Sequence, residues 1–363
     1  MKKTGRIFLS AFLFAAILTG CAKNEGNLNQ ASLKQAIDQG AVKLNTAMNT
    51  ISATQAYSIL TMNEGSMMKS STATDSIYRV YIPLDKIKGV YEYNKVSKHN
   101  NWGMSLLHFF TKTADNSQMI VRMPLKKVTR PGNLRHYSKA DSSLTNNFSI
   151  AVSDYHNNYN SFRDYDYVLS SEISVDNVVA GNLDINTLIS PTLGTHYTSQ
   201  YAFAGGYTAK YKYESGDTTS SIFTIMNGAN ILYEEKLFTI KNDTAKFGRE
   251  HQYILTIGNV QIIRNSDTKK VQIAVDGVVQ PGAVVTIMDK EGDKEGDKEG
   301  DNEESVCKKR DIQITFEDGT VKTVSALIGE SVNNIKTLYS SLHQVYFAAY
   351  IVDWIAYDIY YQR

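Results

Sequence analysis

The first regular pattern along the chain is a stripe of apolar side chains at helical spacing. Its members recur at steps of three or four residues: Leu33, Ile37, Ala41, Leu44, Met48 and Ile51. This spacing predicts an amphipathic helix over about residues 33–51. Ser32 and Gln35 stand in the S-x-x-Q spacing of a capping box, which predicts that the helix begins there. Gly40 interrupts the stripe and costs about 1 kcal/mol of helix propensity relative to alanine.

From residue 57 onward the pattern changes, and apolar positions alternate with polar ones as in strands. The clearest region is residues 197–240, where turn signals recur at Gly205-Gly206, Ser215-Gly216-Asp217 and Asn227-Gly228. Tight turns join only antiparallel strands, so this region predicts an antiparallel meander. Asp115-Asn116, Asp276-Gly277 and Asp318-Gly319 mark further turns between apolar runs.

A second helix is predicted at the end of the chain, over about residues 332–360. Its stripe has the same spacing: Ile335, Leu338, Leu342, Val345, Ala349, Val352, Ile355 and Ile359. Asp353 and Asp358 interrupt an otherwise apolar run, which favours a helix that covers a sheet over one that spans a membrane.

Together these patterns predict an α+β fold. We expect a large, curved, antiparallel β-sheet, a meander or half-barrel, with an N-terminal amphipathic helix and a C-terminal helix packed on it. The expected divisions are a signal peptide at 1–20, a tether at 21–31, a helix-plus-sheet region at 32–288 and an acidic repeat at 289–304. Residues 305–363 then supply a hairpin and the last helix.

Residues 289–304 read DKEGDKEGDKEGDNEE, in which nine acids against three lysines give a charge of −6. Without apolar side chains this run predicts a disordered linker or a long loop. A calcium-binding EF-hand loop requires glycine at its sixth position, where a loop beginning at Asp289 has Lys294. The repeat therefore does not match that type of site.

Composition limits the class of protein. The chain has 363 residues, 42% of them hydrophobic, which is enough for a sizeable core. Lys and Arg number 38 against 37 Asp and Glu, so the basic excess of a nucleic-acid-binding protein is absent, and no nucleic-acid partner is expected. Two cysteines cannot build a disulfide framework or a four-thiolate zinc site.

The N-terminus has the layout of an export signal. Lys2, Lys3 and Arg6 precede an apolar run of 12 residues, 7–18, which is too short to span a bilayer comfortably. The next residues, Leu18-Thr19-Gly20-Cys21, closely resemble the lipobox of bacterial lipoproteins. The resemblance implies cleavage before Cys21, lipidation of Cys21 and attachment to a membrane. Ala22 stands where Asp signals inner-membrane retention, so the resemblance implies the outer membrane; the alternative is an ordinary cleaved signal with an incidental cysteine.

Candidate catalytic residues are sparse. None of the seven histidines lies two or four positions from another, and the sequence contains no G-x-S-x-G, P-loop or G-x-G-x-x-G motif. Asp154, Tyr155 and His156 could act in acid–base chemistry, but a solvated polar loop is the favoured interpretation. Asp353 could be a buried carboxyl with a raised pKa, although we expect it to face water or to pair with a basic group on the sheet. The sequence thus predicts a non-enzymatic protein without metal or cofactor.

The 23 tyrosines offer a candidate ligand surface. Tyr207, Tyr211 and Tyr213 share one face of a predicted strand with Ala209, and such a face can stack sugars or line an apolar cup. The alternative is that these tyrosines simply fill a half-buried sheet face, which suits their strand propensity.

Three tripeptides resemble the Asp-Ser/Thr-apolar acceptor of O-glycosylation in Bacteroidetes-type periplasmic proteins. They are Asp75-Ser76-Ile77, Asp217-Thr218-Thr219 and Asp243-Thr244-Ala245. A chain this rich in serine and threonine also produces such matches by chance, so glycosylation stays open.

The layout, an exported helix followed by a long antiparallel meander with a further helix, resembles LolA/LolB-like lipid-carrier proteins. This resemblance is architectural and implies a curved half-barrel that holds acyl chains beneath helices. We therefore expect a membrane-anchored lipoprotein that binds a hydrophobic or lipidic ligand. The alternative is an envelope or surface platform for a protein or glycan partner. A third possibility, an envelope hydrolase, has no supporting set of residues.

Overall fold

The computed structural model describes residues 28–61, 79–94, 109–128, 143–245, 248–266, 268, 270–289, 310–329, 331–343 and 347–361. Cys21, the Asp75-Ser76-Ile77 tripeptide and all of the acidic repeat except Asp289 lie outside these residues. Predictions that concern those segments therefore stay predictions.

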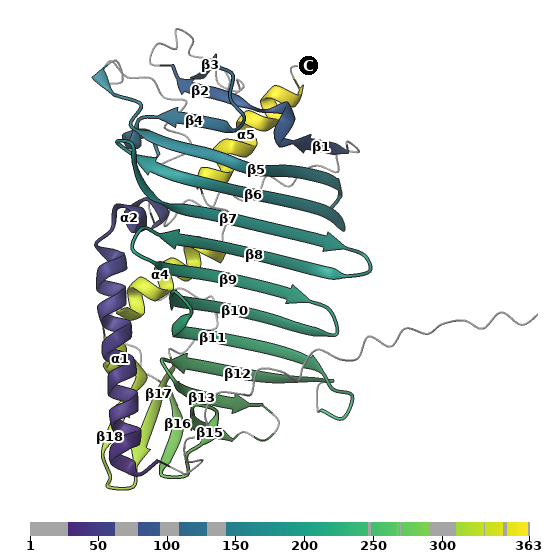
Figure 1. The fold of residues 1–363 in the computed structure, drawn as a ribbon. Coiled ribbons are helices and arrows are strands. Elements are labelled where there is room, and N and C mark those ends of the chain that lie inside the picture. Colours follow the sequence, from purple (N-terminus) through teal and green to yellow (C-terminus); the bar gives the residue numbers. More distant parts are fainter. Residues whose placement is uncertain are drawn as a thin grey trace, which may run out of the picture.

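The protein has an α+β fold, as the sequence predicts (Figure 1). The helices are α1 (Gln30–Ser52), α2 (Gln55–Thr61), α3 (Val324–Ile328), α4 (Ser331–His343) and α5 (Phe347–Tyr361), with 3-10 turns at Leu84–Lys86 and Leu125–Lys127. The strands before the main meander are β1 (Val80–Pro83), β2 (Gly89–Tyr93), β3 (Phe110–Ala114) and β4 (Met119–Met123). The meander itself comprises β5 (Phe148–Ser161), β6 (Asp164–Val175), β7 (Val178–Ser190), β8 (Gly194–Phe203), β9 (Tyr207–Ser215), β10 (Thr218–Asn227), β11 (Asn230–Lys241), β12 (Arg249–Ile257), β13 (Val260–Asn265), β14 (Val271–Val275) and β15 (Val278–Val279). A small second sheet holds β16 (Ala283–Asp289), β17 (Arg310–Phe316) and β18 (Val321–Thr323).

The main sheet has fifteen strands, and from β4 to β15 each strand pairs with the next along the chain. These pairs are all antiparallel, so the predicted meander is confirmed. The predicted turn at Asn227-Gly228 joins β10 to β11, with Gly228 at φ 57°. Sequence analysis missed the turn between β6 and β7, where Asp176 and Asn177 both adopt positive φ, at 51° and 63°. This backbone favours Asp and Asn among non-glycine residues.

One end of the main sheet departs from the meander. The turn at Asp115-Asn116 joins β3 to β4, but these strands do not pair with each other. Instead β2 lies between them, antiparallel to β3 and parallel to β4. The turn was predicted correctly. The order of the three strands in the sheet depends on tertiary contacts, which local sequence patterns do not indicate.

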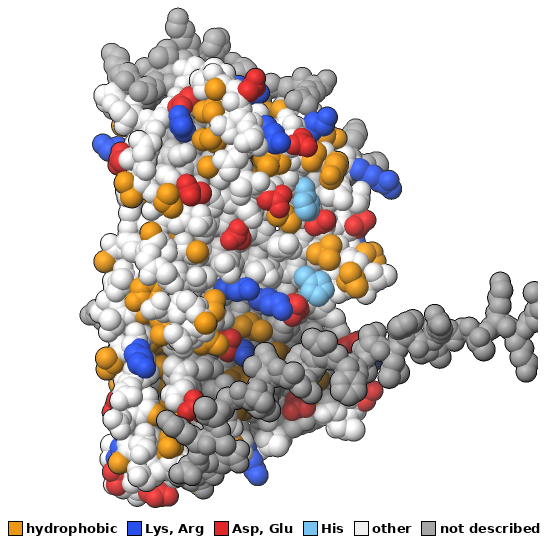
Figure 2. Space-filling model, in the orientation of Figure 1, with side chains coloured by type: hydrophobic (Ala, Val, Ile, Leu, Met, Phe, Trp, Pro, Cys, Tyr) orange, Lys and Arg blue, Asp and Glu red, His pale blue; other side chains and the backbone are white. Residues whose placement is uncertain are grey.

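Alternation along the strands divides the sheet into a buried face and an open face. In β6, Tyr167, Leu169 and Ile173 are buried, whereas Glu172 between them is exposed. Helices α4 and α5 lie across the buried face, and α1 runs along one end of the strands (Figure 1). The opposite face carries polar and charged side chains and is the face seen in Figure 2. Each fully buried Leu, Ile or Phe at the helix–sheet contact stabilises the fold by about 1.5–3 kcal/mol.

Three predictions about the helices require correction. The capping box at Ser32 is wrong, because the helix begins earlier and Asn29 caps it by accepting the backbone N–H of Ser32 at 2.9 Å. The strand pattern predicted from residue 57 onward is interrupted at its start by α2, Gln55–Thr61. The predicted single helix over 332–360 is two helices, α4 and α5. No helix within the described ranges is long and apolar enough to cross a membrane.

Strands β16 and β17 show where the acidic repeat is attached. They pair antiparallel, with Asp289 opposite Arg310, so the two ends of the segment between them are neighbours in one sheet. Asp318-Gly319 joins β17 to β18 as predicted, with Gly319 at φ 78°.

Candidate functional site

The three predicted ligand-contact tyrosines lie on the helix-covered side of β9, but they have different surroundings. Tyr211 is only 3% exposed, and its ring lies 5.5 Å from that of Tyr339 and 5.1 Å from that of His343, both on α4. Tyr213 is half-buried against the same core. In the folded chain Tyr211 packs beneath α4 and Tyr213 packs against the core, as the alternative interpretation of the tyrosines expects.

Tyr207 is also half-buried against the core, but it borders an open groove between α1 and the ends of the strands. The groove has a volume of about 860 Å³. One wall is α1, and the other is formed by the start of β9 together with the β10–β11 and β12–β13 turns. Residues more than 180 positions apart in sequence therefore form one site. Ligand contact by Tyr207, Tyr211 and Tyr213 stays a prediction, and Tyr207 is the one placed in a hollow.

A glycine in α1 explains how the helix can lie so close to these turns. A Cβ atom at Gly40 would stand 2.8 Å from the carbonyl oxygen of Ile257, at the end of β12. The Cα of Gly40 in turn lies 3.2 Å from where a Cβ of Gly258 would be. The glycine that weakens the helix propensity therefore allows backbone-to-backbone contact at the base of the groove.

The groove combines exposed apolar side chains with uncommitted amides. Val42 is 64% exposed and Ile231 38% exposed, on opposite walls. The side chains of Gln39, Asn227 and Asn230 make no hydrogen bond to another residue in the described part of the chain. None of the lining residues is acidic. Such a site can accept and donate hydrogen bonds beside an apolar surface, the usual chemistry of a binding pocket.

A half-buried aspartate, Asp353, lies elsewhere, between α5 and the sheet. Oδ1 of Asp353 accepts hydrogen bonds from the hydroxyls of Tyr155 on β5, at 3.0 Å, and Tyr167 on β6, at 3.1 Å. Burial raises the pKa of Asp353 to about 7, although the two hydroxyl donors act in the opposite direction. The favoured prediction, that Asp353 faces water or pairs with a basic group, is wrong. Its neighbours are tyrosines because the covered face of β5 and β6 is aromatic.

The neighbouring residues Asp154, Tyr155 and His156 do not all lie on one face of the sheet. They belong to β5 rather than to the predicted polar loop, so their side chains alternate between the two faces. Tyr155 is buried beneath α5, whereas Asp154 is exposed on the open face. His156 shares that open face and pairs with Asp166, with Nε2 and Oδ1 2.9 Å apart.

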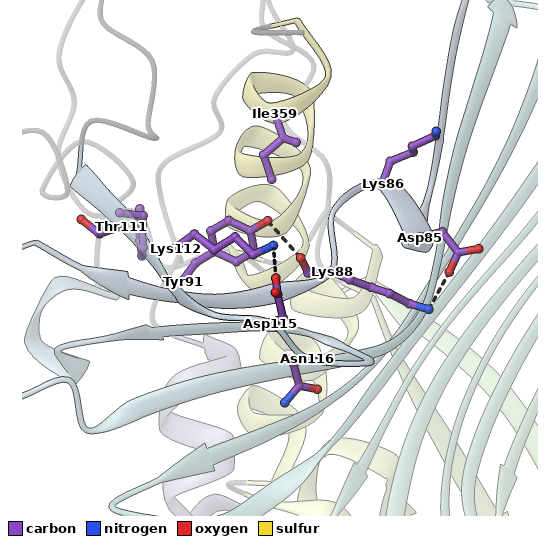
Figure 3. Close-up of a pocket in the computed structure, with 10 residues that line it drawn as sticks. Asp85, Lys86, Lys88, Tyr91, Thr111, Lys112, Asp115, Asn116 and Ile359 are labelled. Carbon is purple, nitrogen blue, oxygen red and sulfur yellow. Dashed lines mark hydrogen bonds and ion pairs between the residues drawn. The ribbon is translucent and has the colours of Figure 1, made fainter.

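A second hollow, of about 790 Å³, lies at the far end of the sheet, beside β2, β3 and the end of α5 (Figure 3). Its charges are already paired: Lys88 lies 2.5 Å from Asp85, and Lys112 lies 2.7 Å from Asp115. These lysines lower the pKa of both carboxyls. Because its charged groups satisfy one another, this hollow is a weaker binding candidate than the groove.

Beneath α1, an apolar cavity lined by Ile37, Leu255 and Ile314 among others has a volume of about 10 Å³. That is about the space needed by one water molecule and is far too small for an acyl chain. Within the described ranges, no group of three or more His, Cys, Asp or Glu side chains is placed to hold a metal ion.

The Asn227-Gly228 turn was predicted from the sequence, but the position of the Asn227 and Asn230 amides in a groove was not. No local signal links residues 227–232 to residues 36–47, because α1 meets these turns only through the tertiary fold. Compared with known proteins, the chain matches no protein family, no curated protein and no solved structure.

Proposed function

We propose that this protein is a non-enzymatic, membrane-anchored envelope lipoprotein that binds a glycan in the groove between α1 and the strand turns. The observation that carries the proposal is the set of uncommitted amides of Gln39, Asn227 and Asn230 around an open hollow that also holds Tyr207. This is the platform hypothesis drawn from the sequence, with a particular site assigned to it.

The chemistry of the groove favours a glycan. Amide groups both donate and accept hydrogen bonds, as sugar hydroxyls do, and an aromatic ring such as that of Tyr207 can stack on a sugar face. Val42 and Ile231 add exposed apolar surface for the C–H groups of a sugar ring. A volume of about 860 Å³ lies within the range of ordinary ligand sites, about 300–1,000 Å³.

The lipid-carrier hypothesis has weaker support. A carrier needs an apolar cavity, and the space beneath α1 is about 10 Å³. Lipid binding therefore stays a prediction, and an acyl chain would need more apolar space than this cavity offers.

The membrane anchor is proposed from the lipobox resemblance at Leu18-Thr19-Gly20-Cys21. Lipidation at Cys21, with Ala22 after it, places the protein at the outer membrane in this proposal. Replacing Cys21→Ser should leave the precursor unprocessed or release the protein from the membrane fraction. Normal processing and fractionation of that variant would contradict the anchor.

Binding is tested with the full mature protein on an array of bacterial envelope glycans, followed by calorimetry of the best-retained glycan. We expect Tyr207→Ala and Asn230→Ala each to weaken binding by about tenfold, equivalent to about 1.4 kcal/mol. Tyr81→Ala and Asn182→Ala are matched controls, because both residues are exposed and lie outside the groove. These controls should bind as the wild type does.

Two outcomes would reject the proposal. One is that the array retains no glycan; the other is that the groove variants bind as tightly as the controls. Retention of a polar peptide, with affinity lost in the groove variants, would replace the glycan by a protein partner.

A further inference from the structure

Exposed apolar side chains gather at the end of the molecule where the described chain begins. We call this set the end patch: Leu28, Val278, Val279, Val284 and Val321. Their side chains are between 37% and 63% exposed. Single exposed apolar residues are ordinary on a protein surface, but a group of five at one end requires explanation.

Local contacts bring these residues together. The backbone N–H of Leu28 donates to Oε1 of Gln280 at 2.8 Å, and Gln280 directly follows Val278 and Val279. In the small sheet, Val284 lies opposite Thr315, which lies opposite Val321. Figure 1 shows β15 to β18 and the beginning of α1 at the same end of the molecule.

The small sheet has one face packed into the core, and its other face carries exposed valines beside Thr286 and Thr315 in the described part of the chain. Val285, Ile314 and Phe316 are buried on the side that packs into the core. An antiparallel sheet with one solvated face normally carries polar side chains there. Val284 and Val321 break that rule, with exposures of 63% and 50%.

We infer that the end patch lies against the surface of a lipid bilayer. This inference rests on the proposed anchor at Cys21, which precedes Leu28 by seven residues. Seven residues reach at most about 25 Å even when fully extended, so a bilayer that holds the acyl chains of Cys21 lies close to this end. Lipid-anchored proteins commonly gain firm attachment from a second contact beside the acyl chains.

Charges at this end indicate which bilayer the patch fits. Lys34 pairs with Asp318, and Lys322 pairs with Asp38, so the lysines nearest the patch are neutralised by carboxylates. The patch therefore suits a zwitterionic surface and not an anionic one.

With the end patch on the bilayer, the orientation of the molecule relative to the membrane is fixed. Helix α1 begins at the patch and, with 23 residues, extends about 35 Å from it. The groove, which uses residues 36–47 of that helix, then faces the aqueous space above the membrane. A membrane-attached glycan-binding protein requires this orientation.

The test measures depth in the bilayer with a polarity-sensitive dye. Single cysteines replace Val284→Cys, Val321→Cys or the control Val178→Cys, in full-length lipoprotein carrying Cys307→Ser. Val178 is 70% exposed at the β6–β7 turn, away from the patch. The labelled proteins are reconstituted in phosphatidylethanolamine–phosphatidylcholine vesicles that contain a brominated lipid quencher, and mass spectrometry reads the lipid on Cys21.

We expect several-fold stronger quenching at positions 284 and 321 than at 178, decreasing when phosphatidylglycerol is added. Equal quenching at all three positions, on protein whose Cys21 carries lipid, would overturn the orientation and leave the anchor standing. A mass spectrum without lipid on Cys21 would overturn the anchor and, with it, the inference.

Discussion

The carboxyl of Asp353 is kept neutral by the fold over a range of pH in which an exposed aspartate is ionised. Its pKa is raised to about 7 by burial against Tyr155 and Tyr167. The unfolded chain, in which the pKa is about 3.9, binds this proton less tightly. The contribution of Asp353 to the free energy of unfolding therefore falls as pH rises from about 4 to about 7, by at most about 1.4 kcal/mol per pH unit.

We predict that Asp353→Asn removes this loss of stability. Both tyrosine hydroxyls donate to Oδ1, an atom that asparagine retains, so the variant keeps both hydrogen bonds without a charge. At pH 8 it should be more stable than the wild type by a few kcal/mol, and near pH 4 the two should be similar. Chemical denaturation across this pH range measures the difference.

Asp154→Asn is the control, because Asp154 is exposed on the opposite face of the strand that carries Tyr155. Other carboxyls act in the opposite direction; the pKa of Asp318, for example, is lowered by its bond to Lys34. Comparing each variant with the wild type removes their contribution. The same slope between pH 4 and 7 in wild type and Asp353→Asn would contradict the prediction.

Gly40 provides a second test at a single residue. Alanine at this position should gain about 1 kcal/mol of helix propensity, yet its Cβ would meet the carbonyl oxygen of Ile257 at 2.8 Å. We predict that the clash dominates, so that Gly40→Ala lowers the unfolding midpoint. Gln35→Ala, at an exposed position of the same helix, should change it little. A higher midpoint in Gly40→Ala would show that α1 shifts without cost.

At the scale of elements, two residues are possible N-caps of α1, Asn29 and Ser32. Asn29 accepts the N–H of Ser32, whereas the sequence pattern placed the cap at Ser32 itself. We predict that Asn29→Ala lowers the free energy of unfolding by about 0.5–2 kcal/mol and that Ser32→Ala has a much smaller effect. If denaturation shows that Ser32→Ala lowers the free energy of unfolding more than Asn29→Ala does, Ser32 is the cap and the prediction is contradicted.

The elements that could be predicted well from the sequence are those that depend on local chemistry. The turns at Asn227-Gly228 and Asp318-Gly319 each place a glycine at positive φ. The stripe in α1 faces the core because its spacing matches the helix. The insertion of β2 between β3 and β4 depends on distant packing. Local periodicity carries no information about it.

At the scale of the whole molecule, the α+β class and the meander could be predicted, but the binding surface could not. Alternation in β9 identified a tyrosine face correctly, and that face is largely covered by α4. Only the tertiary fold decides that Tyr211 is covered while Tyr207 borders a groove. The same limit applied to Asp353, whose burial depends on how α5 crosses the sheet.

The central claim is that a ligand binds in the groove while the helix-covered tyrosine face stays closed. Carbene footprinting of the full mature protein, with and without the glycan retained on the array, tests it directly. The account predicts that glycan lowers labelling at residues 36–47 and 227–232 and leaves the segments around Tyr155, Tyr167 and α5 unchanged. Labelling changes confined to those segments would contradict it and would place the ligand beneath the helices.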